Sequence, residues 1–292
     1  MEQYKNIGLI GRVENAAVIE SIVQIKDYLL SRELNVIIEE ETAAALSDHG
    51  LQICSHTQLG ETADLIIVVG GDGSMLGAAR ALARHKVPVL GVNRGRLGFL
   101  TDLSPSNLED GLEQVLRGNY ILESRFLLEA SIQRNGETIA SGHALNDVVL
   151  QPGMATRMIE FELFVDGLFV YSQRSDGLII ATPTGSTAYS LSAGGPIMHP
   201  SLDAMVLVPM FPHTLTNRPI VVSGGSEIKI VLSEENHSNL QMSCDGQDSF
   251  TIIPGDHICI RKHPHKLRLV HLMDHNYYEV CRNKLGWGSR LA

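Results

Sequence analysis

The loop Gly70-Gly71-Asp72-Gly73 combines the residue types and the position that suit chemistry best in this 292-residue chain. It directly follows the apolar run 65–69, and apolar residues at helical spacing resume at Met75. Ligands bind at the carboxyl ends of strands in open α/β sheets, and glycines let the backbone approach a ligand closely. Asp72 is therefore a candidate catalytic carboxylate. The alternative is a tight strand-to-helix turn in which the aspartate is incidental.

The loop does not fit the two common phosphate-binding motifs. Gly71, Gly73 and Gly77 give only G-x-G-x-x-x-G, and Asp72 would point toward a bound pyrophosphate. Two like charges about 4 Å apart repel by about 4 kcal/mol at an effective dielectric constant near 20. The Walker pattern G-x-x-x-x-G-K-[ST] does not occur in the sequence. Asp72 fits better opposite a group that must lose a proton, or opposite a metal ion.

The second candidate segment is the stretch 177–196, which follows Asp176 and contains no charged residue. Its many Gly, Ser and Thr residues offer backbone N–H groups and hydroxyls with little side-chain bulk. Phosphate-rich and ribose-rich ligands are held by such groups. An ordinary surface loop is the alternative, although such loops rarely run this long without a charge.

Isolated polar residues elsewhere could grip the same kind of ligand. Asn146-Asp147 could hold ribose hydroxyls, but such a pair is more often a turn. Arg157 and Arg174 could each bind a phosphate through two hydrogen bonds, although single arginines are usually surface residues. Asp245-Gly246-Gln247 resembles a hairpin turn.

The sequence argues against a zinc site and against a nucleophilic serine. His263, His265, His271 and His275 are the densest group of histidines, yet structural zinc sites usually show closer pairs together with cysteines. We expect solvated histidines at strand ends there, and no metal ligands. Ser186 lacks the G-x-S-x-G pattern of a nucleophilic serine.

Strands and helices alternate in the first third of the chain. Short apolar runs predict strands over 7–10, 36–38, 65–69 and 87–92. Apolar residues at helical spacing predict helices over 18–29 and 75–83, the latter capped by Ser74, and another that opens at Ser104-Pro105. This alternation predicts an α/β domain with a parallel, doubly wound sheet.

The pattern changes near Ser124, where short alternating runs separated by turn signals begin. Asn135-Gly136 and Asp166-Gly167 are strong hairpin signals, and residues 159–165 alternate between apolar and polar side chains. We therefore expect an α/β domain over 1–123, a β-rich sandwich domain over 124–270, and a tail over 271–292 that packs back on the first domain.

Composition excludes several classes of protein. A formal charge of -10 and the lack of any run of Lys or Arg argue against nucleic acid as a partner. No apolar run reaches the roughly 18 residues that a membrane span needs. None of the four cysteines forms a C-x-x-C pair, and no signal-peptide pattern opens the chain. A cytoplasmic protein with reduced thiols is expected.

Several of these segments together resemble the NAD kinase family, along nearly the whole chain. The Gly70-Gly71-Asp72-Gly73 loop is shared with a wider group of kinases. Within that group, residues 93–100 favour the NAD kinase family. The run 182–196 is similar to the family's signature and is strongly specific. Pro212-His213-Thr214-Leu215 with Arg218-Pro219, and Asp245-Gly246-Gln247, match further family segments.

The resemblance implies ATP-dependent phosphorylation of the 2′-hydroxyl on the adenosine ribose of NAD, in a site between the two domains, with Mg²⁺ accompanying ATP. Asp72 would accept the proton, with Gly73 beside it. The residues that would hold NAD are Asn146, Asp147, Arg157, Arg174, Asp176, Thr187, Ala188, Tyr189, Ser190, Leu191, Ser192 and Gln247. Arg157 falls where the family varies, and Asn146-Asp147 departs from the Asn-Glu pair of many members.

The family assembles as homodimers or homotetramers, often with sites completed by a neighbouring subunit, so the same assembly is expected here. Two other functions stay open. One is a related kinase that acts on a lipid or a sugar. The other is a sensor that binds NAD or NADP without catalysis and has no use for Asp72.

Overall fold

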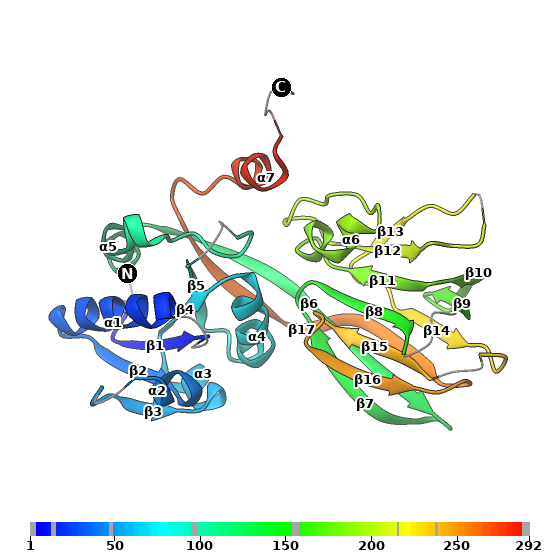
Figure 1. The fold of residues 1–292 in the computed structure, drawn as a ribbon, viewed down its shortest axis with the longest axis horizontal. Coiled ribbons are helices and arrows are strands. Elements are labelled where there is room, and N and C mark those ends of the chain that lie inside the picture. Colours follow the sequence, from blue (N-terminus) through cyan, green and yellow to red (C-terminus); the bar gives the residue numbers. More distant parts are fainter. Residues whose placement is uncertain are drawn as a thin grey trace. The chain divides into compact units, whose positions relative to one another are not determined.

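The structure is a computed structural model that describes residues 4–12, 16–46, 49–94, 98–153, 158–214, 216–236 and 239–287. The chain forms two compact units. The first comprises Met1–Ser124 and Lys266–Ala292, and the second comprises Arg125–His265. Figure 1 follows the elements of each unit along the sequence.

The first unit is built on a parallel sheet with the strand order β3-β2-β1-β4-β5-β17. All six residues of β4 are buried, as expected for a strand covered on both faces. This arrangement confirms the predicted α/β domain. The strands are β1 (Asn6–Gly11), β2 (Asn35–Glu39), β3 (Gln52–Cys54), β4 (Leu65–Gly70), β5 (Pro88–Asn93) and the C-terminal part of β17 (His257–Leu272).

Amphipathic helices accompany this sheet. Helix α1 buries Val18, Ile22, Ile25 and Leu29, the residues whose spacing predicted it. The predicted helix at Ser104-Pro105 begins as a 3-10 turn and continues as α5. The helices are α1 (Ala16–Ser31), α2 (Glu40–Ala44), α3 (His56–Thr62), α4 (Asp72–Leu82), η1 (Ala83–His85), η2 (Pro105–Asn107), α5 (Leu108–Leu116) and α7 (Tyr277–Leu285).

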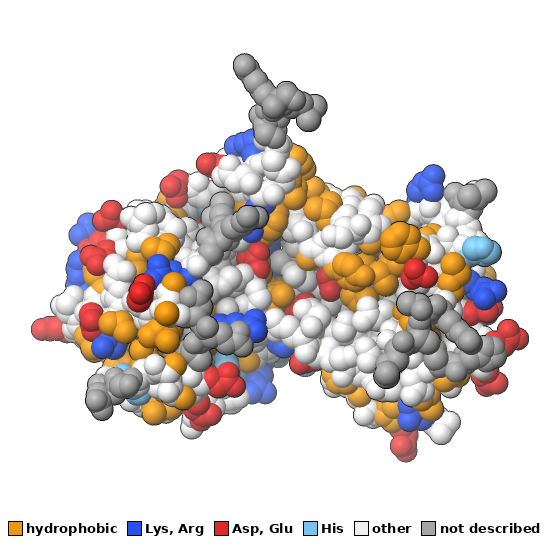
Figure 2. All heavy atoms as spheres, viewed as in Figure 1, with side chains coloured by type: hydrophobic (Ala, Val, Ile, Leu, Met, Phe, Trp, Pro, Cys, Tyr) orange, Lys and Arg blue, Asp and Glu red, His pale blue; other side chains and the backbone are white. Residues whose placement is uncertain are grey.

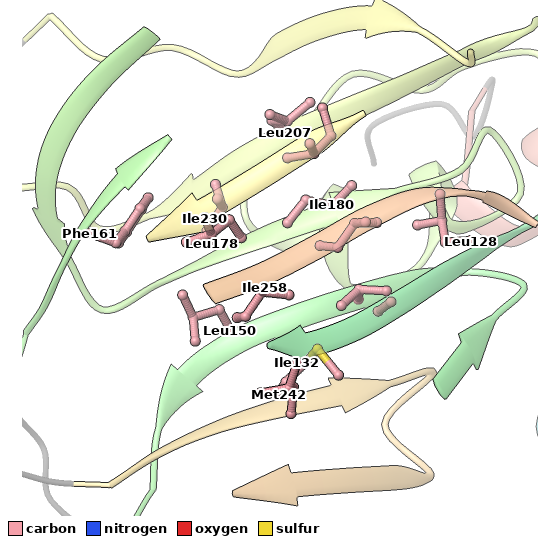
Figure 3. Packing of buried hydrophobic residues seen from close by; sticks show 14 of the residues in the cluster. Leu128, Ile132, Leu150, Phe161, Leu178, Ile180, Leu207, Ile230, Met242 and Ile258 are labelled. Atoms are coloured by element: carbon pink, nitrogen blue, oxygen red, sulfur yellow. The ribbon is translucent and has the colours of Figure 1, made fainter. Parts of the chain in front are cut away.

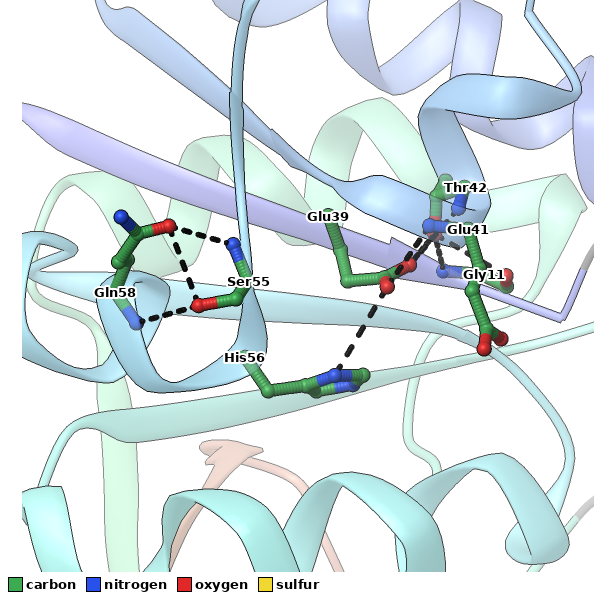
Figure 4. Close-up of polar contacts among 7 residues, drawn as sticks. All are labelled: Gly11, Glu39, Glu41, Thr42, Ser55, His56 and Gln58. Atoms are coloured by element: carbon green, nitrogen blue, oxygen red, sulfur yellow. Dashed lines mark hydrogen bonds and ion pairs between the residues drawn. The ribbon is translucent and has the colours of Figure 1, made fainter.

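Two short helices, α2 and α3, were not predicted, and Figure 4 shows the side chains that start them. The buried Glu39 carboxylate accepts the backbone N–H groups of Glu41 and Thr42. The Thr42 hydroxyl is also bonded to the backbone of Gly11 at the end of β1. At α3, Ser55 and Gln58 form a capping box. Side-chain caps therefore fix the ends of strands near the sheet edge.

The second unit has two antiparallel sheets. One contains β6 (Tyr120–Arg134), β7 (Glu137–Ala144), β9 (Ile159–Val165), β10 (Leu168–Ser175), β14 (Ile228–Leu232) and β17. The other has the order β13-β12-β11-β8-β15-β16. Its strands are β8 (Asp147–Pro152), β11 (Gly177–Ala181), β12 (Ala204–Met210), β13 (Ile220–Ser223), β15 (Leu240–Cys244) and β16 (Asp248–Ile252).

A largely aliphatic core joins these two sheets. Figure 3 shows Ile258 of one sheet beside Leu150 of the other, within a cluster that also contains Leu128, Phe161 and Met242. This packing confirms the predicted sandwich. The hairpin turns at Asn135-Gly136 and Asp166-Gly167 are also confirmed, because both residues of each turn have positive φ angles of 51° to 83°.

Charged side chains are dispersed on the face that Figure 2 shows, where Lys and Arg lie among Asp and Glu. Within the described ranges, no helix combines the length and the apolar character needed to cross a bilayer.

The C-terminal helix α7 belongs to the first unit, and the Asn276 side chain caps its start by accepting two backbone N–H groups.

Candidate active site

The candidate catalytic loop is the junction between β4 and α4, which begins at Asp72. Gly71 is the N-cap, and its carbonyl accepts the N–H groups of Ser74 and Met75 at 3.0 and 3.3 Å. The prediction that Ser74 caps this helix is therefore wrong. The helix starts three residues earlier because Gly71 has the extended backbone of an N-cap, and Ser74 lies within the first turn.

The Asp72 carboxylate is oriented by the segment that follows β5. Its Oδ2 accepts the Phe99 N–H and its Oδ1 accepts the Leu100 N–H, both at 3.1 Å. A Cβ atom at Gly98 would lie 2.1 Å from Asp72 Oδ1, so only glycine leaves room for the carboxylate there. Asp72 is half-buried and Gly73 is exposed. The carboxylate is therefore fixed in direction while the loop remains accessible.

The segment 93–100, which contains the Phe99 and Leu100 amides, is held next to the catalytic loop by hydrogen bonds. Arg94 donates its backbone N–H to the Gly70 carbonyl at 3.3 Å, which ties the end of β5 to the end of β4. The Arg94 guanidinium bonds the Ala17 carbonyl and the Glu20 carboxylate on α1. Residues 95–97 of this motif lie outside the described residues.

In the second unit, Asp245 organises the loop that contains Asn146 and Asp147. Its carboxylate accepts the backbone N–H groups of Leu145, Asn146 and Asp147 at 2.9, 2.7 and 3.2 Å. Asp245 and Gly246 have φ angles of 54° and 63°, as expected for the predicted hairpin turn. The turn thus has a second role that sequence reasoning missed, because Asp245 is also the anchor of a distant loop.

Asp147 itself is almost completely buried, with 4% of its surface exposed. Burial, together with the nearby Asp245 charge, raises the pKa of Asp147 to about 7. Asn146 is half-buried, and its carbonyl accepts the Thr182 N–H at 2.9 Å. A Cβ atom at Gly185 would lie 2.1 Å from that carbonyl oxygen. The Asn146-Asp147 pair is therefore packed directly against the uncharged run.

Residues 182–186 of the uncharged stretch 177–196 are buried, so this part of the stretch is not a surface loop. The Thr182 hydroxyl donates to the Leu145 carbonyl at 2.6 Å and accepts the Gly185 N–H at 3.1 Å. The Ser186 hydroxyl accepts the Met198 N–H at 2.9 Å. These bonds fix the backbone from which the accessible residues project.

The candidate ligand residues of this run lie on η3 (Gly185–Thr187) and α6 (Tyr189–Ser192). Tyr189 and Ser192 are exposed, whereas Thr187, Ala188 and Leu191 are half-buried. Ser190 is fully buried, and its hydroxyl has no hydrogen-bond partner among the residues that the structure describes. Gln247, in the turn anchored by Asp245, is exposed.

Arg174 and Asp176 precede the end of β11 that lies away from the Asn146-Asp147 loop. Ala181 at one end of β11 pairs with Asp147, and Asp176 precedes the other end, five residues away. At about 3.3 Å per residue this separation is roughly 17 Å. Both residues are exposed, and Asp176 donates its N–H to the Met210 carbonyl at 2.9 Å. Arg157 lies outside the described residues.

The histidine-rich segment contains a cluster that sequence reasoning missed. The structure brings Asp102 to His271 and His275, and all three can present ligand atoms within 4.8 Å of one another. The prediction of solvated histidines is wrong for His271, which is 2% exposed. Although burial alone would act the other way, hydrogen bonds with Asp102 and Glu123 raise the pKa of His271, and the two histidines hold the pKa of Asp102 below its usual range.

Comparison with known families gives two matches. Residues 7–120 match the ATP-NAD kinase N-terminal domain, and residues 145–272 match the ATP-NAD kinase C-terminal domain. The chain is 64% identical over 292 residues to the NAD kinase of Ectopseudomonas mendocina (strain ymp) and 63% identical to that of Pseudomonas putida (strain GB-1). Each alignment covers 100% of this chain and 99% of the relative.

Solved structures agree with these matches. A crystal structure of yeast NADH kinase complexed with NADH superposes with a TM-score of 0.92 at 26% identity, covering 100% of this chain and 91% of the other. An NAD kinase from Archaeoglobus fulgidus in complex with ATP gives a TM-score of 0.72 at 27% identity, covering 96% and 97%. The sequence and the fold therefore agree, and the chain belongs to the NAD kinase family of phosphotransferases.

Proposed function

We propose that the protein transfers the γ-phosphoryl group of ATP to the 2′-hydroxyl on the adenosine ribose of NAD, giving NADP, with Asp72 as the general base. The observation that supports this most directly is the fixed carboxylate of Asp72 at the carboxyl end of a buried parallel strand. The names of its relatives support the choice of NAD and ATP as substrates.

The chemistry requires a base, because a ribose hydroxyl is a weak nucleophile that must lose its proton as the phosphoryl group arrives. A positioned carboxylate that accepts this proton accelerates such a step by about 10²- to 10⁴-fold. Among the residues that the structure describes, each Asp72 oxygen accepts one backbone N–H, and a carboxylate offers about four acceptor positions. Asp72 therefore keeps acceptor capacity for the hydroxyl while its direction is fixed.

The second unit supplies the residues for binding NAD, so that residues from both units act on one substrate. Asn146 and Asp147 suit the ribose hydroxyls, since they offer an amide and a carboxyl group on a loop held by three hydrogen bonds to Asp245. Residues 187–192 and Gln247 complete this part of the site with hydroxyls, backbone groups and an amide.

Arg174 and Asp176 would serve the NAD site of a neighbouring subunit in a homodimer or homotetramer. The separation of roughly 17 Å along β11 supports this assignment, because it keeps the exposed Asp176 away from the Asn146-Asp147 loop of its own chain. Arg174 is suited to a phosphate of the bound dinucleotide.

Mg²⁺ would arrive with ATP as part of the substrate, and the residues present are compatible with it. The ion prefers oxygen ligands, and the half-buried Asp72 carboxylate is such a donor at the catalytic loop. When bound, Mg²⁺ neutralises the phosphoryl oxygens during transfer. None of the four cysteines is in a disulfide, which fits a reducing cytoplasm, where we place the protein.

One assay tests this function against its rivals. The protein is incubated with MgATP and NAD, and any NADP formed is measured with an NADP-specific dehydrogenase, while ³¹P NMR locates the new phosphate. We expect NADP carrying a 2′-phosphate. If no condition gives NADP, a lipid or sugar kinase or a non-catalytic NAD(P) sensor is the better account.

The role of Asp72 is tested in the same assay with a matched control. We expect Asp72→Asn to lower kcat by about 10²- to 10⁴-fold. Asp110→Asn, an exposed aspartate on α5, should leave kcat unchanged. A near-normal kcat in Asp72→Asn would show that Asp72 is not the base.

A further inference from the structure

A cluster of metal-ligating side chains lies in the first unit, where β17 ends and the chain turns into α7. Asp102 Oδ1 lies 2.9 Å from His271 Nδ1 and 3.1 Å from His275 Nδ1. The two imidazole rings stack with their centroids 3.9 Å apart. None of these residues belongs to the proposed NAD or ATP machinery, so the cluster needs an explanation of its own.

Neighbouring groups fix the orientation of two of these ligands. His271 Nε2 lies 3.0 Å from the Glu123 carboxylate, so that with a metal bound at Nδ1 the Nε2–H would donate to Glu123. Asp102 Oδ2 accepts the Leu272 N–H at 3.0 Å and also lies 3.0 Å from His271 Nδ1, while Oδ1 is within reach of both histidines. A histidine that binds zinc usually donates its other ring N–H to an outer group such as a carboxylate, and Glu123 is placed for that role.

Two of the three separations between donor atoms are close to those around a tetrahedral ion. Zinc bonds of about 2.0 to 2.1 Å place neighbouring ligand atoms about 3.3 to 3.4 Å apart. The 2.9 and 3.1 Å separations therefore need to open by about 0.2 to 0.5 Å. Two imidazoles and one carboxylate favour zinc over Mg²⁺ or Ca²⁺, which prefer sets of oxygen ligands.

Space and an unused polar group adjoin the cluster. A cavity of about 150 Å³ is lined by Asp102, His275 and Thr101. Thr101 is 2% exposed, and its hydroxyl has no hydrogen-bond partner within the part of the chain that the structure describes. Three protein ligands leave a zinc ion with an open position, and a cavity of this size admits water.

We propose that Asp102, His271 and His275 bind one zinc ion, with Glu123 as the outer carboxylate. The ion would join the segment after β5, which contains Asp102, to the turn at residues 272–276 that precedes α7. Its role is structural, since it fastens the C-terminal helix to the sheet of its own unit. Zinc would displace protons from the two imidazoles, so binding strengthens as pH rises.

The test measures metal binding and does not depend on kinase activity. The full chain is freed of metal with a chelator and titrated at pH 7.5 with Zn²⁺ in competition with a chromophoric chelator. Co²⁺ serves as a second probe, because its visible absorption reports four-coordination. His271→Gln and His275→Gln remove single ligands, and Glu123→Gln removes the outer carboxylate. His265→Gln is the matched control, a histidine of the same strand outside the cluster.

We expect one equivalent of Zn²⁺ per chain in the unaltered protein and in His265→Gln. Either ligand variant should weaken binding at least 100-fold, and Glu123→Gln about 10- to 100-fold. Zinc should raise the Tm of the unaltered protein and not that of His275→Gln. Circular dichroism of each metal-free variant verifies its fold. A double variant, His271→Gln with His275→Gln, lacks both imidazole ligands. The proposal is overturned if the unaltered protein binds Zn²⁺ no more tightly than this double variant. It is also overturned if His265→Gln loses as much Zn²⁺ affinity as the ligand variants.

Discussion

Asp72 and Asp147 are two carboxyl groups at strand ends, one in each unit, and their surroundings differ in kind. Asp72 is half-buried at the start of α4 and accepts two backbone N–H groups. Asp147 is 4% exposed and lies near the charge of Asp245, so its pKa is raised to about 7. The first environment orients a carboxylate near solvent, and the second favours a bound proton.

The difference suggests a division of labour between the two carboxyl groups. A group that must accept a proton from a substrate needs accessible lone pairs, which the Asp72 geometry provides. A protonated Asp147 can donate a hydrogen bond to a ribose oxygen as well as accept one. The same residue type can thus perform chemistry in one unit and recognition in the other.

The comparison depends most on Asp245, which holds the loop that contains Asp147. Asp245→Ala removes the acceptor of three backbone N–H groups, and bonds to charged acceptors contribute about 1.5 to 3 kcal/mol each. We expect the free energy of unfolding to fall by about 3 to 5 kcal/mol and NAD binding to weaken. Chemical denaturation measures the loss, with Glu234→Ala on the exposed surface as the control. A loss equal to that of the control would show that the clamp is unimportant.

The state of Asp147 is tested by the pH dependence of stability. The native protein holds a proton at Asp147 between its unfolded pKa of 3.8 and its native pKa of about 7, and the unfolded chain releases it. The free energy of unfolding therefore falls as pH rises through this window, by roughly 2 to 3 kcal/mol between pH 5 and pH 8.

Asp147→Asn removes this titration, so the variant should gain stability relative to the unaltered protein as pH rises from 5 to 8. Denaturation curves at several pH values give the two slopes. Parallel slopes for the two proteins would contradict a raised pKa at Asp147.

The orientation of Asp72 is tested through Gly98. In Gly98→Ala the new methyl group would approach Asp72 Oδ1 to 2.1 Å, so the carboxylate must move. We expect kcat to fall by about 10- to 30-fold, equivalent to about 1.4 to 2 kcal/mol, with NAD affinity retained. Gly225→Ala is the control, since its Cβ would meet Ser223 Oγ at an ordinary van der Waals distance of 3.8 Å. An unaltered kcat in Gly98→Ala would argue against a strict orientation of Asp72.

A change remote from both carboxyl groups shows how much a small loss of stability alone affects kcat. Ser55→Ala removes the capping box of α3 and should cost about 1 kcal/mol of stability. Thermal or chemical denaturation measures this cost. A large loss of kcat in this variant would mean that stability defects alone disturb the site, which would weaken the inferences from the other variants.

Much of the fold was predictable because periodicity reports it directly. The apolar run before Gly70 predicted the buried strand β4, and the spacing of Val18, Ile22 and Leu29 predicted α1. Helix α2 was missed because its cap is Glu39, a residue that is not among the preferred N-caps. Helix α3 could have been found, since Ser55 and Gln58 have the spacing of a capping box.

The candidate site was predictable where a residue stands in a recognisable motif, as Asp72 does. Asp245 was missed as an anchor because Asp-Gly is fully explained by its own hairpin turn, so no further signal marks its bonds to Leu145 and Asn146. Asp102 was missed because it lies 169 residues from His271, and only the folded chain joins them. Such long-range pairs leave no trace in local spacing.

The central claim is that Asp72 performs chemistry whereas the Asn146-Asp147 loop binds NAD. Calorimetric titration of NAD into Asp72→Asn and Asn146→Ala tests it most directly. We predict that Asp72→Asn keeps its dissociation constant within about threefold of the unaltered protein, and that Asn146→Ala weakens NAD binding at least about tenfold, or 1.4 kcal/mol. The reverse result, with binding lost in Asp72→Asn and kept in Asn146→Ala, would contradict this account.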